Sequence, residues 1–289
     1  MVATSRSSTR NRVGLVLTPR TRDLLVSVYQ LRQATKAQLC RLHFAQLAHR
    51  AGDWESSLPG RVLRKLVREQ FLIARPLPLE RPNGRPPLVY SLGPSAVSAV
   101  SHALSLAFEA VLQRQRQDGK LSWLFWNHRQ LLANCWIALR VACQARGYAL
   151  RWTTDEELAQ RKEYATLAGK TVPIRPDAFF VVDRGHKVAR FVEAQVSSEP
   201  RAYERKARAM AQYYTSGAFS QRFGFQGLRV LAITDTPRRA ANLQTVVSCL
   251  PECALFWSTT ARAFCDDPFG PIWRVGGEER PAALLGGEQ

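Results

Sequence analysis

Hydrophobic residues in the first third of the chain recur at helical spacing, in three successive segments. The pair Thr18-Pro19 consists of residue types that begin helices, and the apolar positions after it share one face as far as Leu31. A second start signal at Thr35 precedes another amphipathic stretch. The third segment covers residues 56–71. This pattern predicts three consecutive helices.

The third predicted helix has two faces of different chemistry. At about 100° per residue, its apolar side chains fall on one face and its cations on the other. The apolar face consists of Val62, Leu63, Leu66 and Val67. The opposite face carries Arg61, Arg64, Lys65 and Arg68. A solvated face usually mixes signs, and here only Glu69 interrupts the positive charge, so this face is suited to a polyanion.

Two β-rich runs, LIARPLPL and PLVYSL, follow the third helix. The connecting residues 80–85 contain Asn83-Gly84, a strong hairpin signal, with Arg81 and Arg85 at the tip. Three helices and a hairpin are typical of a winged helix-turn-helix, whose third helix enters the major groove of double-stranded DNA while the wing reaches along the backbone. The alternative is a protein–protein module with a solvated basic face.

After Leu121 the pattern changes to alternating helices and strands. A long apolar helix ends near Gly147, and two strands are joined by the turn Asp183-Arg184-Gly185. This alternation predicts a mixed sheet covered by helices on both faces, and therefore an α/β (α+β) fold class. The polar stretch 113–120 has no apolar face and is predicted to be a linker. The predicted parts are a flexible basic arm (1–17), a winged helix domain (18–112), the linker (113–120), an α/β domain (121–275) and a flexible tail (276–289).

Composition limits the classes of function. The 289 residues include 41 Lys and Arg against 23 Asp and Glu, a formal net charge of +18, which favours phosphate backbones. Residues 1–100 hold 16 basic and 5 acidic side chains, so the surplus is largest there. No run approaches about 20 apolar residues, which excludes a membrane-spanning helix. Six cysteines without paired spacing predict reduced thiols in a cytoplasmic protein, which would be associated with the nucleoid through DNA.

Short motifs in the second part resemble those of a known nuclease fold. Arg-Pro-Asp177 begins one strand, and Glu193-Ala-Gln195 ends its hairpin neighbour. This arrangement is similar to the PD-(D/E)XK nuclease-like fold, in which a helix, three strands, a helix and a strand follow one another. More narrowly, nearly the whole chain resembles the replication-relaxation family of plasmids and mobile elements. The other motifs behind this resemblance are the winged helix, the basic helix with Tyr213 and Tyr214, and the segment Asp267-Pro-Phe-Gly-Pro-Ile-Trp273.

The resemblance implies a site for Mg²⁺ at the two strand ends. Asp177 and Glu193 would share the metal, which would lower the pKa of a bound water and stabilise charge on a phosphate. The lysine usual two residues after the glutamate is replaced by Gln195, which brings no charge, although some restriction endonucleases resembling this fold carry glutamine there. Lys206 on the following helix would supply the missing cation, and Glu156 is the candidate for the outer acidic position.

Structural roles compete with these catalytic ones. Asp177 follows a proline, and aspartate is common where a strand begins. Glu193 would pair with Arg190 or Lys206. His128 lies among aromatic residues, where a buried or capping role is expected in preference to a general base.

Three functions remain open. The leading hypothesis is a DNA-binding protein of a plasmid or mobile element, active in replication, mobilisation or a related DNA transaction. Its nuclease-like domain would be largely non-catalytic and would bind DNA or the replication, transfer or recombination proteins of the element. The second hypothesis is a Mg²⁺-dependent endonuclease or nickase that uses Asp177 and Glu193, with Gln195 as the argument against it. The third is a winged-helix transcriptional regulator.

Overall fold

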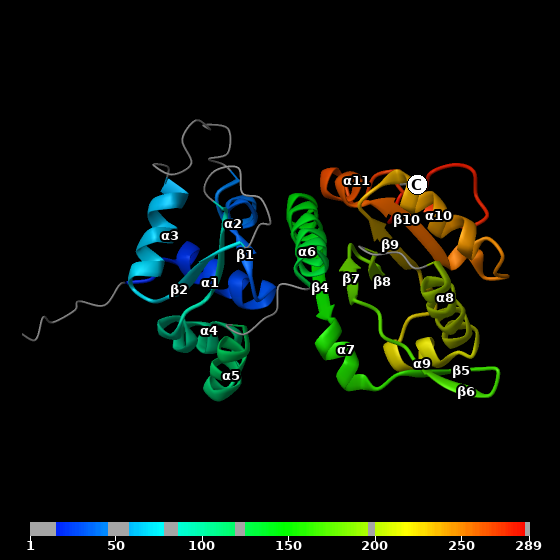
Figure 1. The fold of residues 1–289 in the computed structure, drawn as a ribbon, viewed down its shortest axis with the longest axis horizontal. Helices are drawn as coiled ribbons and strands as arrows, with labels where there is room; N and C mark the ends of the chain where they lie inside the picture. The colour runs from blue at the N-terminus through cyan, green and yellow to red at the C-terminus, as the bar shows by residue number, and fades with distance from the viewer. Residues whose placement is uncertain (1–15, 46–57, 78–85, 119–124, 196–199, 287–289) are drawn as a thin grey trace, which may run out of the picture. The chain divides into compact units, whose positions relative to one another are not determined.

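A computed structural model describes five stretches of the chain, namely residues 16–45, 58–77, 86–118, 125–195 and 200–286. The contacts divide the chain into two compact units, Met1–Leu121 and Ser122–Gln289. Each unit has its own sheet and its own hydrophobic core (Figure 1). Helices and a mixed sheet confirm the predicted α/β (α+β) class.

The first unit opens with three helices. The side chain of Thr18 caps the first by accepting a hydrogen bond from the backbone N–H of Thr21 at 3.3 Å. A capping box between Thr35 and Gln38 begins the second. The predicted helix starts at these two threonines are therefore confirmed. The helices are α1 (Pro19–Leu31), α2 (Lys36–His43) and α3 (Leu58–Arg68).

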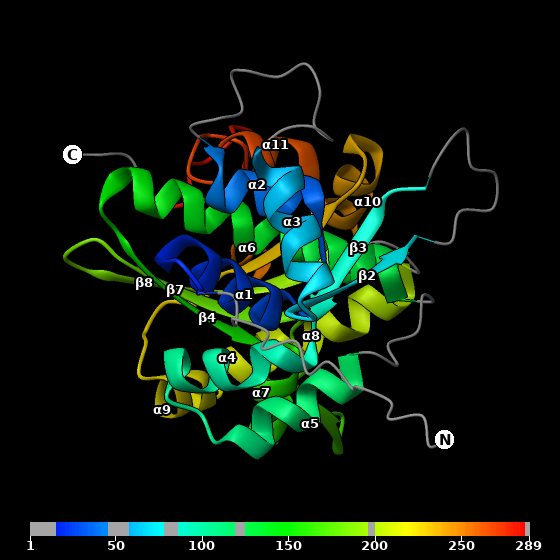
Figure 2. The same cartoon turned by 90° about the vertical axis from the view of Figure 1, so that its left-hand side faces the viewer.

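A small antiparallel sheet, in the order β1-β3-β2, lies beside these helices (Figure 2). Its strands are β1 (Ala34–Thr35), β2 (Leu72–Pro76) and β3 (Leu88–Leu92). The hairpin continues past the strands, because the backbone N–H of Leu77 donates to the carbonyl of Pro87 at 2.9 Å. The expected hairpin tip, with Arg81 and Arg85, lies outside the described residues.

Two further helices complete the first unit, α4 (Val97–Leu104) and α5 (Phe108–Asp118). Residues 113–118, predicted to belong to the linker 113–120, are instead part of α5. Val111 is fully buried in the core of this unit, and the buried Asp118 pairs with Arg32 at 2.6 Å. The linker prediction was wrong here because residues 113–118 are all polar, so this half of α5 has no apolar stripe in the sequence.

The second unit consists of a mixed sheet with helices on both faces (Figure 1). Among the described residues the sheet has six strands in the order β11-β10-β9-β8-β7-β4. Strands β4, β7 and β8 are antiparallel neighbours, whereas β8, β9 and β10 are parallel. The strands are β4 (Ala149–Thr154), β7 (Ala178–Asp183), β8 (Lys187–Gln195), β9 (Val230–Thr234), β10 (Phe256–Thr260) and β11 (Arg274–Val275).

Alternating side chains of the central strands supply two separate cores. Phe179 of β7 packs on one face with Phe191 and the helices α8, α9 and α10. The next residue, Phe180, packs on the other face with α6 and α11, because successive strand residues point to opposite sides. The helices are α6 (Trp126–Arg146), α8 (Pro200–Thr215), α9 (Ala218–Phe223), α10 (Pro237–Val247) and α11 (Ala261–Asp266).

Between β4 and β7 the chain forms a short helix and a separate hairpin. The helix α7 (Asp155–Arg161) carries three acidic residues in its first turn, Asp155, Glu156 and Glu157. The hairpin, β5 (Tyr164–Leu167) and β6 (Lys170–Pro173), was not expected, because its few residues alternate too briefly to be recognised.

The C-terminal segment packs onto the sheet, so the predicted flexible tail at 276–289 is wrong for residues 276–286. Leu284 is completely buried in the core on the α6 side of the sheet. The backbones of Trp273 and Ala282 exchange hydrogen bonds at 3.2 and 2.8 Å. Glycine and charged residues dominate this stretch in sequence, and only the fold shows that its few apolar side chains reach a core.

Candidate functional site

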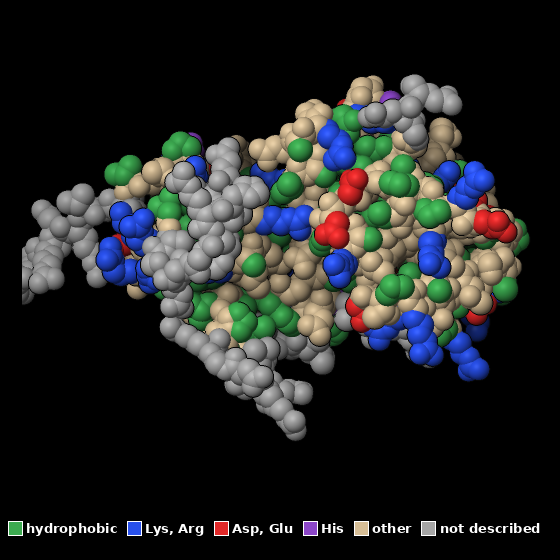
Figure 3. Space-filling view, turned by 90° about the horizontal axis from the view of Figure 1, so that it is seen from above, with side chains coloured by type: hydrophobic (Ala, Val, Ile, Leu, Met, Phe, Trp, Pro, Cys, Tyr) green, Lys and Arg blue, Asp and Glu red, His purple; other side chains and the backbone are tan. Residues whose placement is uncertain are grey.

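The helix α3 presents the first candidate surface. Leu63 and Leu66 are each 1% exposed, in the core of the first unit. The opposite side, which we call the cationic face, consists of the exposed side chains of Arg61, Arg64, Lys65 and Arg68. Lys and Arg side chains gather over α3 at one end of the first unit (Figure 3). Arg68 pairs with Glu69 at 3.0 Å, but an exposed pair is weak and leaves the face positive.

The second candidate site lies at one end of the strand pair β7–β8. The register pairs Ala178 with Val192, so that Asp177, just before β7, lies opposite Glu193. The backbone N–H of Asp177 donates to the carbonyl of Val192 at 3.0 Å. One carboxylate oxygen of Asp177 (Oδ2) accepts from the backbone N–H of Ala194 at 2.8 Å. The structure therefore brings these two carboxylates to the same end of adjacent strands.

Lys206 approaches the same strand ends from α8. Its Nζ forms an ion pair with Oε2 of Glu193, and the side chains are 32% and 0% exposed respectively. Burial raises the pKa of Glu193 to about 8, although the positive charge of Lys206 acts to lower this pKa. Burial acts to lower the pKa of Lys206, but the carboxylates of Glu193 and Asp177 raise it above its ordinary value. We call these three residues the carboxylate–lysine cluster.

His128 comes close to this cluster from α6, on the other side of the sheet. Its Nε2 lies 3.6 Å from Oδ1 of Asp177, and its side chain is 32% exposed. At this distance the contact is an electrostatic attraction whenever the imidazole is protonated. From the sequence, His128 was expected to be buried or to cap a helix, and its contact with Asp177 was not predicted. The only signal was its place near the start of the helix that precedes the first strand.

The last two predicted site residues are less closely tied to the cluster. Gln195 ends β8 and pairs in register with Thr234 of β9, and its side chain lies outside the described part of the structure. Glu156 is exposed in the first turn of α7. Among the described residues, no group of three or more His, Cys, Asp or Glu side chains could hold a metal ion. Glu156 therefore adds no third carboxylate to the pair.

The cluster offers a divalent cation a small set of oxygen ligands. Mg²⁺ is commonly held by one or two carboxylates and completed by water and substrate phosphates, and Asp177 with Glu193 matches that chemistry. One oxygen of each carboxylate is already engaged, by the N–H of Ala194 and by Lys206. The two residues therefore offer the type of ligand atom that Mg²⁺ prefers, but the ammonium of Lys206 competes with the ion for Glu193.

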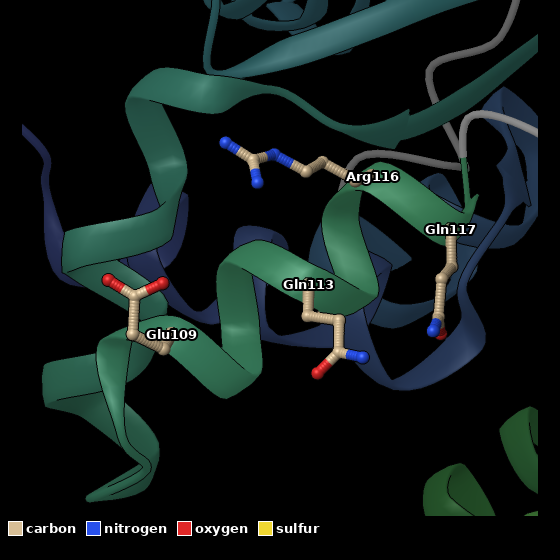
Figure 4. A pocket seen from close by; sticks show the side chains of 4 residues that line it. All are labelled: Glu109, Gln113, Arg116 and Gln117. Carbon is tan, nitrogen blue, oxygen red and sulfur yellow. The ribbon is translucent and has the colours of Figure 1, made fainter.

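A hollow of about 350 Å³ lies along α5 in the first unit (Figure 4). Its lining side chains are Glu109, Gln113, Arg116 and Gln117. They come from one helix and carry charges of both signs, whereas ligand sites usually draw converging groups from several elements. We assign no site to this hollow.

The six cysteines are all free thiols. None of the helices in the described ranges combines the length and the apolar character that crossing a bilayer requires.

Together the two units define a mixed α/β protein with a cationic helix in the first unit and a carboxylate–lysine cluster in the second. The model of the replication-relaxation family matches residues 25–227, a span that includes both of these features. The chain belongs to the replication-relaxation family. This membership connects it with the DNA transactions of plasmids and mobile elements. No curated protein and no solved structure matches the chain significantly.

Proposed function

We propose that the chain is a DNA-binding protein of a plasmid or integrated mobile element and that the cationic face of α3 contacts double-stranded DNA. The observation that carries this proposal is the division of α3 into a buried apolar side and an exposed side with four cations. Contacts between such cations and phosphates supply much of the affinity of DNA-binding proteins. The proposed role is in replication, mobilisation or a related transaction of the element, at the nucleoid.

The order of elements in the first unit supports a winged helix-turn-helix. Three helices precede a β-hairpin, and the third helix carries the cationic face. In winged helices the third helix enters the major groove, while the hairpin lies along the backbone. Arg81 and Arg85, expected at the hairpin tip, are proposed phosphate contacts on the same ground.

For the second unit we propose a nuclease-like platform without strong catalytic activity. The order α6, β4, β7, β8, α8, β9 supports a PD-(D/E)XK-like core, with α7 and one hairpin inserted. The buried carboxyl of Glu193 is already compensated by Lys206, which favours a structural role for the pair. The proposed partners are DNA and the replication, transfer or recombination proteins of the element.

The DNA-binding proposal is tested by measuring the affinity of the full chain for a fluorescent duplex by anisotropy. Replacing Arg64, Lys65 and Arg68 together by Ala should weaken binding at least tenfold and leave the circular dichroism spectrum unchanged. The matched control compares the single variants Arg64→Ala and Arg22→Ala, since both remove one exposed arginine of the first unit. An unchanged affinity in the triple variant would show that α3 is not the DNA surface.

The second candidate function is a metal-dependent endonuclease. The observation in its favour is that Lys206 brings a cation to the two carboxylates, which compensates for Gln195. Asp177 and Glu193 would hold Mg²⁺, and the ion would activate a water and stabilise charge on the phosphate. Lys206 would then help to hold the phosphate, and Ala194 would keep Asp177 oriented through its N–H.

Two measurements decide between platform and enzyme. Supercoiled plasmid is incubated with the chain and Mg²⁺ or Mn²⁺, alongside Asp177→Asn, and the melting temperature is recorded with and without metal. Metal binding to the folded state alone should raise the melting temperature, and Asp177→Asn should abolish the rise. A rise without nicking supports the platform, and nicking that is lost in Asp177→Asn supports the enzyme. No rise and no nicking would leave the pair with a purely structural role.

A further inference from the structure

One side of the helix α5 is fixed to the rest of the first unit. Val111 is fully buried in the core of this unit, and the guanidinium of Arg114 lies over the ring of Tyr29 at 4.7 Å. The side-chain amide of Gln115 donates to the carbonyl of Leu92 at 3.3 Å. These contacts hold the helix in place, so its opposite side is presented to solvent in a fixed orientation.

The solvent side of α5 carries four exposed polar residues, which we call the outer stripe. They are Glu109, Gln113, Arg116 and Gln117, the residues that line the hollow along this helix (Figure 4). Their spacing of four, seven and eight positions places them on one face. Opposite charges support each other on a helix at a spacing of three or four, whereas Glu109 and Arg116 are seven positions apart. Among the described residues, neither of these two forms an ion pair.

Large apolar side chains adjoin the acidic end of the outer stripe. Leu106 and Phe108 are 41% and 48% exposed. Ala107, between them, and Ala110, in the first turn of α5, are exposed as well. Apolar side chains that are exposed next to one another, rather than scattered singly, are typical of a surface that another protein covers.

We propose that the outer stripe binds a second copy of this chain, with the two α5 helices antiparallel across a two-fold axis near Gln113. A two-fold contact requires a self-complementary surface, because the same patch is used by both copies. In this arrangement Glu109 lies opposite the partner's Arg116, and the same pair recurs on the other side of the axis. At the axis the two Gln113 side chains meet, and their amides can bond to one another because each both donates and accepts.

The charge pattern favours a second copy over a different partner. A nucleic acid would be repelled by Glu109, and a partner of one charge would match only one end of the outer stripe, whereas an inverted copy matches both ends. The aliphatic stem of the partner's Arg116 would also cover the apolar side chains beside Glu109. This inference goes beyond the proposed function, since it concerns assembly of the chain in the absence of DNA.

The test measures the dissociation constant of the dimer by sedimentation of the full chain over a series of concentrations. The wild type should show an equilibrium between monomer and dimer. Glu109→Arg and Arg116→Glu should each raise the dissociation constant by about tenfold or more, because each places like charges opposite one another at two positions. An equimolar mixture of these two variants should dimerise again, since the new arginine of one faces the new glutamate of the other and the second pair is the native one.

The matched controls are Asp23→Arg and Arg22→Glu, which introduce the same charge changes at exposed positions of α1. Both controls should dimerise like the wild type, and circular dichroism should show the same fold for all variants. A chain that stays monomeric at every concentration, or a dimer that neither α5 variant weakens, would overturn the inference. A mixture of the two α5 variants that stays monomeric would overturn it as well. No DNA is present in these measurements, so the DNA-binding role of α3 is judged separately by its own variants.

Discussion

At the scale of single residues, Glu193 shows how sequence and environment combine. A glutamate at the end of a central strand is fully buried, where a charged carboxylate would be strongly unfavourable without a partner. Lys206 reaches it from the helix that follows β8, and Asp177, just before β7, lies opposite. The ionisation of Glu193 is therefore coupled to folding, whether or not the cluster is catalytic.

The pH dependence of stability should report this coupling. The pKa of Glu193 is raised from 4.5 to about 8 in the folded chain, so folding favours its protonated form. The resulting stability is fully present below pH 4.5 and is lost as the pH rises through about 8. In Glu193→Gln this decline should be absent, which changes the slope of the unfolding free energy by at most about 1.4 kcal/mol per pH unit.

Urea denaturation at a series of pH values measures the slope. Glu204→Gln is the matched control, because Glu204 lies on the neighbouring helix and is more than one-third exposed. Parallel curves for the wild type and Glu193→Gln would contradict the raised pKa of the buried carboxyl.

At the scale of elements, α5 shows that a polar segment can be integral to a unit. The side chain of Asp118, at the end of α5, is fully buried against Arg32, just after α1. Breaking such a pair leaves a buried charge, so Arg32→Met should lower the unfolding free energy by roughly 3 kcal/mol. Thermal or urea unfolding measures the loss. Adding Asp118→Asn should recover part of it, and a neutral effect of Arg32→Met would mean that α5 is only loosely attached.

The hairpin between β2 and β3 leads to a separate prediction about Arg85. A long cation near a hairpin tip can reach a phosphate without disturbing the core. Arg85→Ala should therefore weaken binding to all duplexes by a similar factor and lower the slope of log K against log salt by about 1. Binding titrations at several salt concentrations measure both. A loss confined to one sequence would instead assign Arg85 to base recognition.

At the scale of the whole molecule, the net charge of +18 is distributed over both units. If the cationic face of α3 contacts phosphates, each lost contact should lower the slope of log K against log salt by roughly 0.9. Replacing Arg64, Lys65 and Arg68 together should therefore lower the slope by about 2.7. Titrations of the full chain at increasing salt measure this change. A slope that is unchanged in this variant would show that these three cations make no phosphate contacts.

Local features of the fold could be read from the sequence because their causes lie within a few neighbouring residues. Thr18 and Thr35 begin helices through bonds to backbone groups three positions away. The two faces of α3 follow from helical periodicity alone, with Leu66 buried and Arg64 exposed as expected. Alternation and turn residues likewise predicted β7, β8 and the mixed sheet.

Features that depend on distant contacts were decided only by the tertiary structure. Leu284 is buried because the sheet, whose strands lie between Ala149 and Val275, forms a core against which it packs, and nothing in its own segment shows this. His128 reaches Asp177 only because α6 and β7 meet at the end of the sheet. The sequence by itself determined most of the helices and strands, the net charge and the spacing of Asp177 and Glu193. The packing of α8 on the sheet then fixed Lys206 against Glu193, since burial and pairing depend on groups brought together by the whole fold.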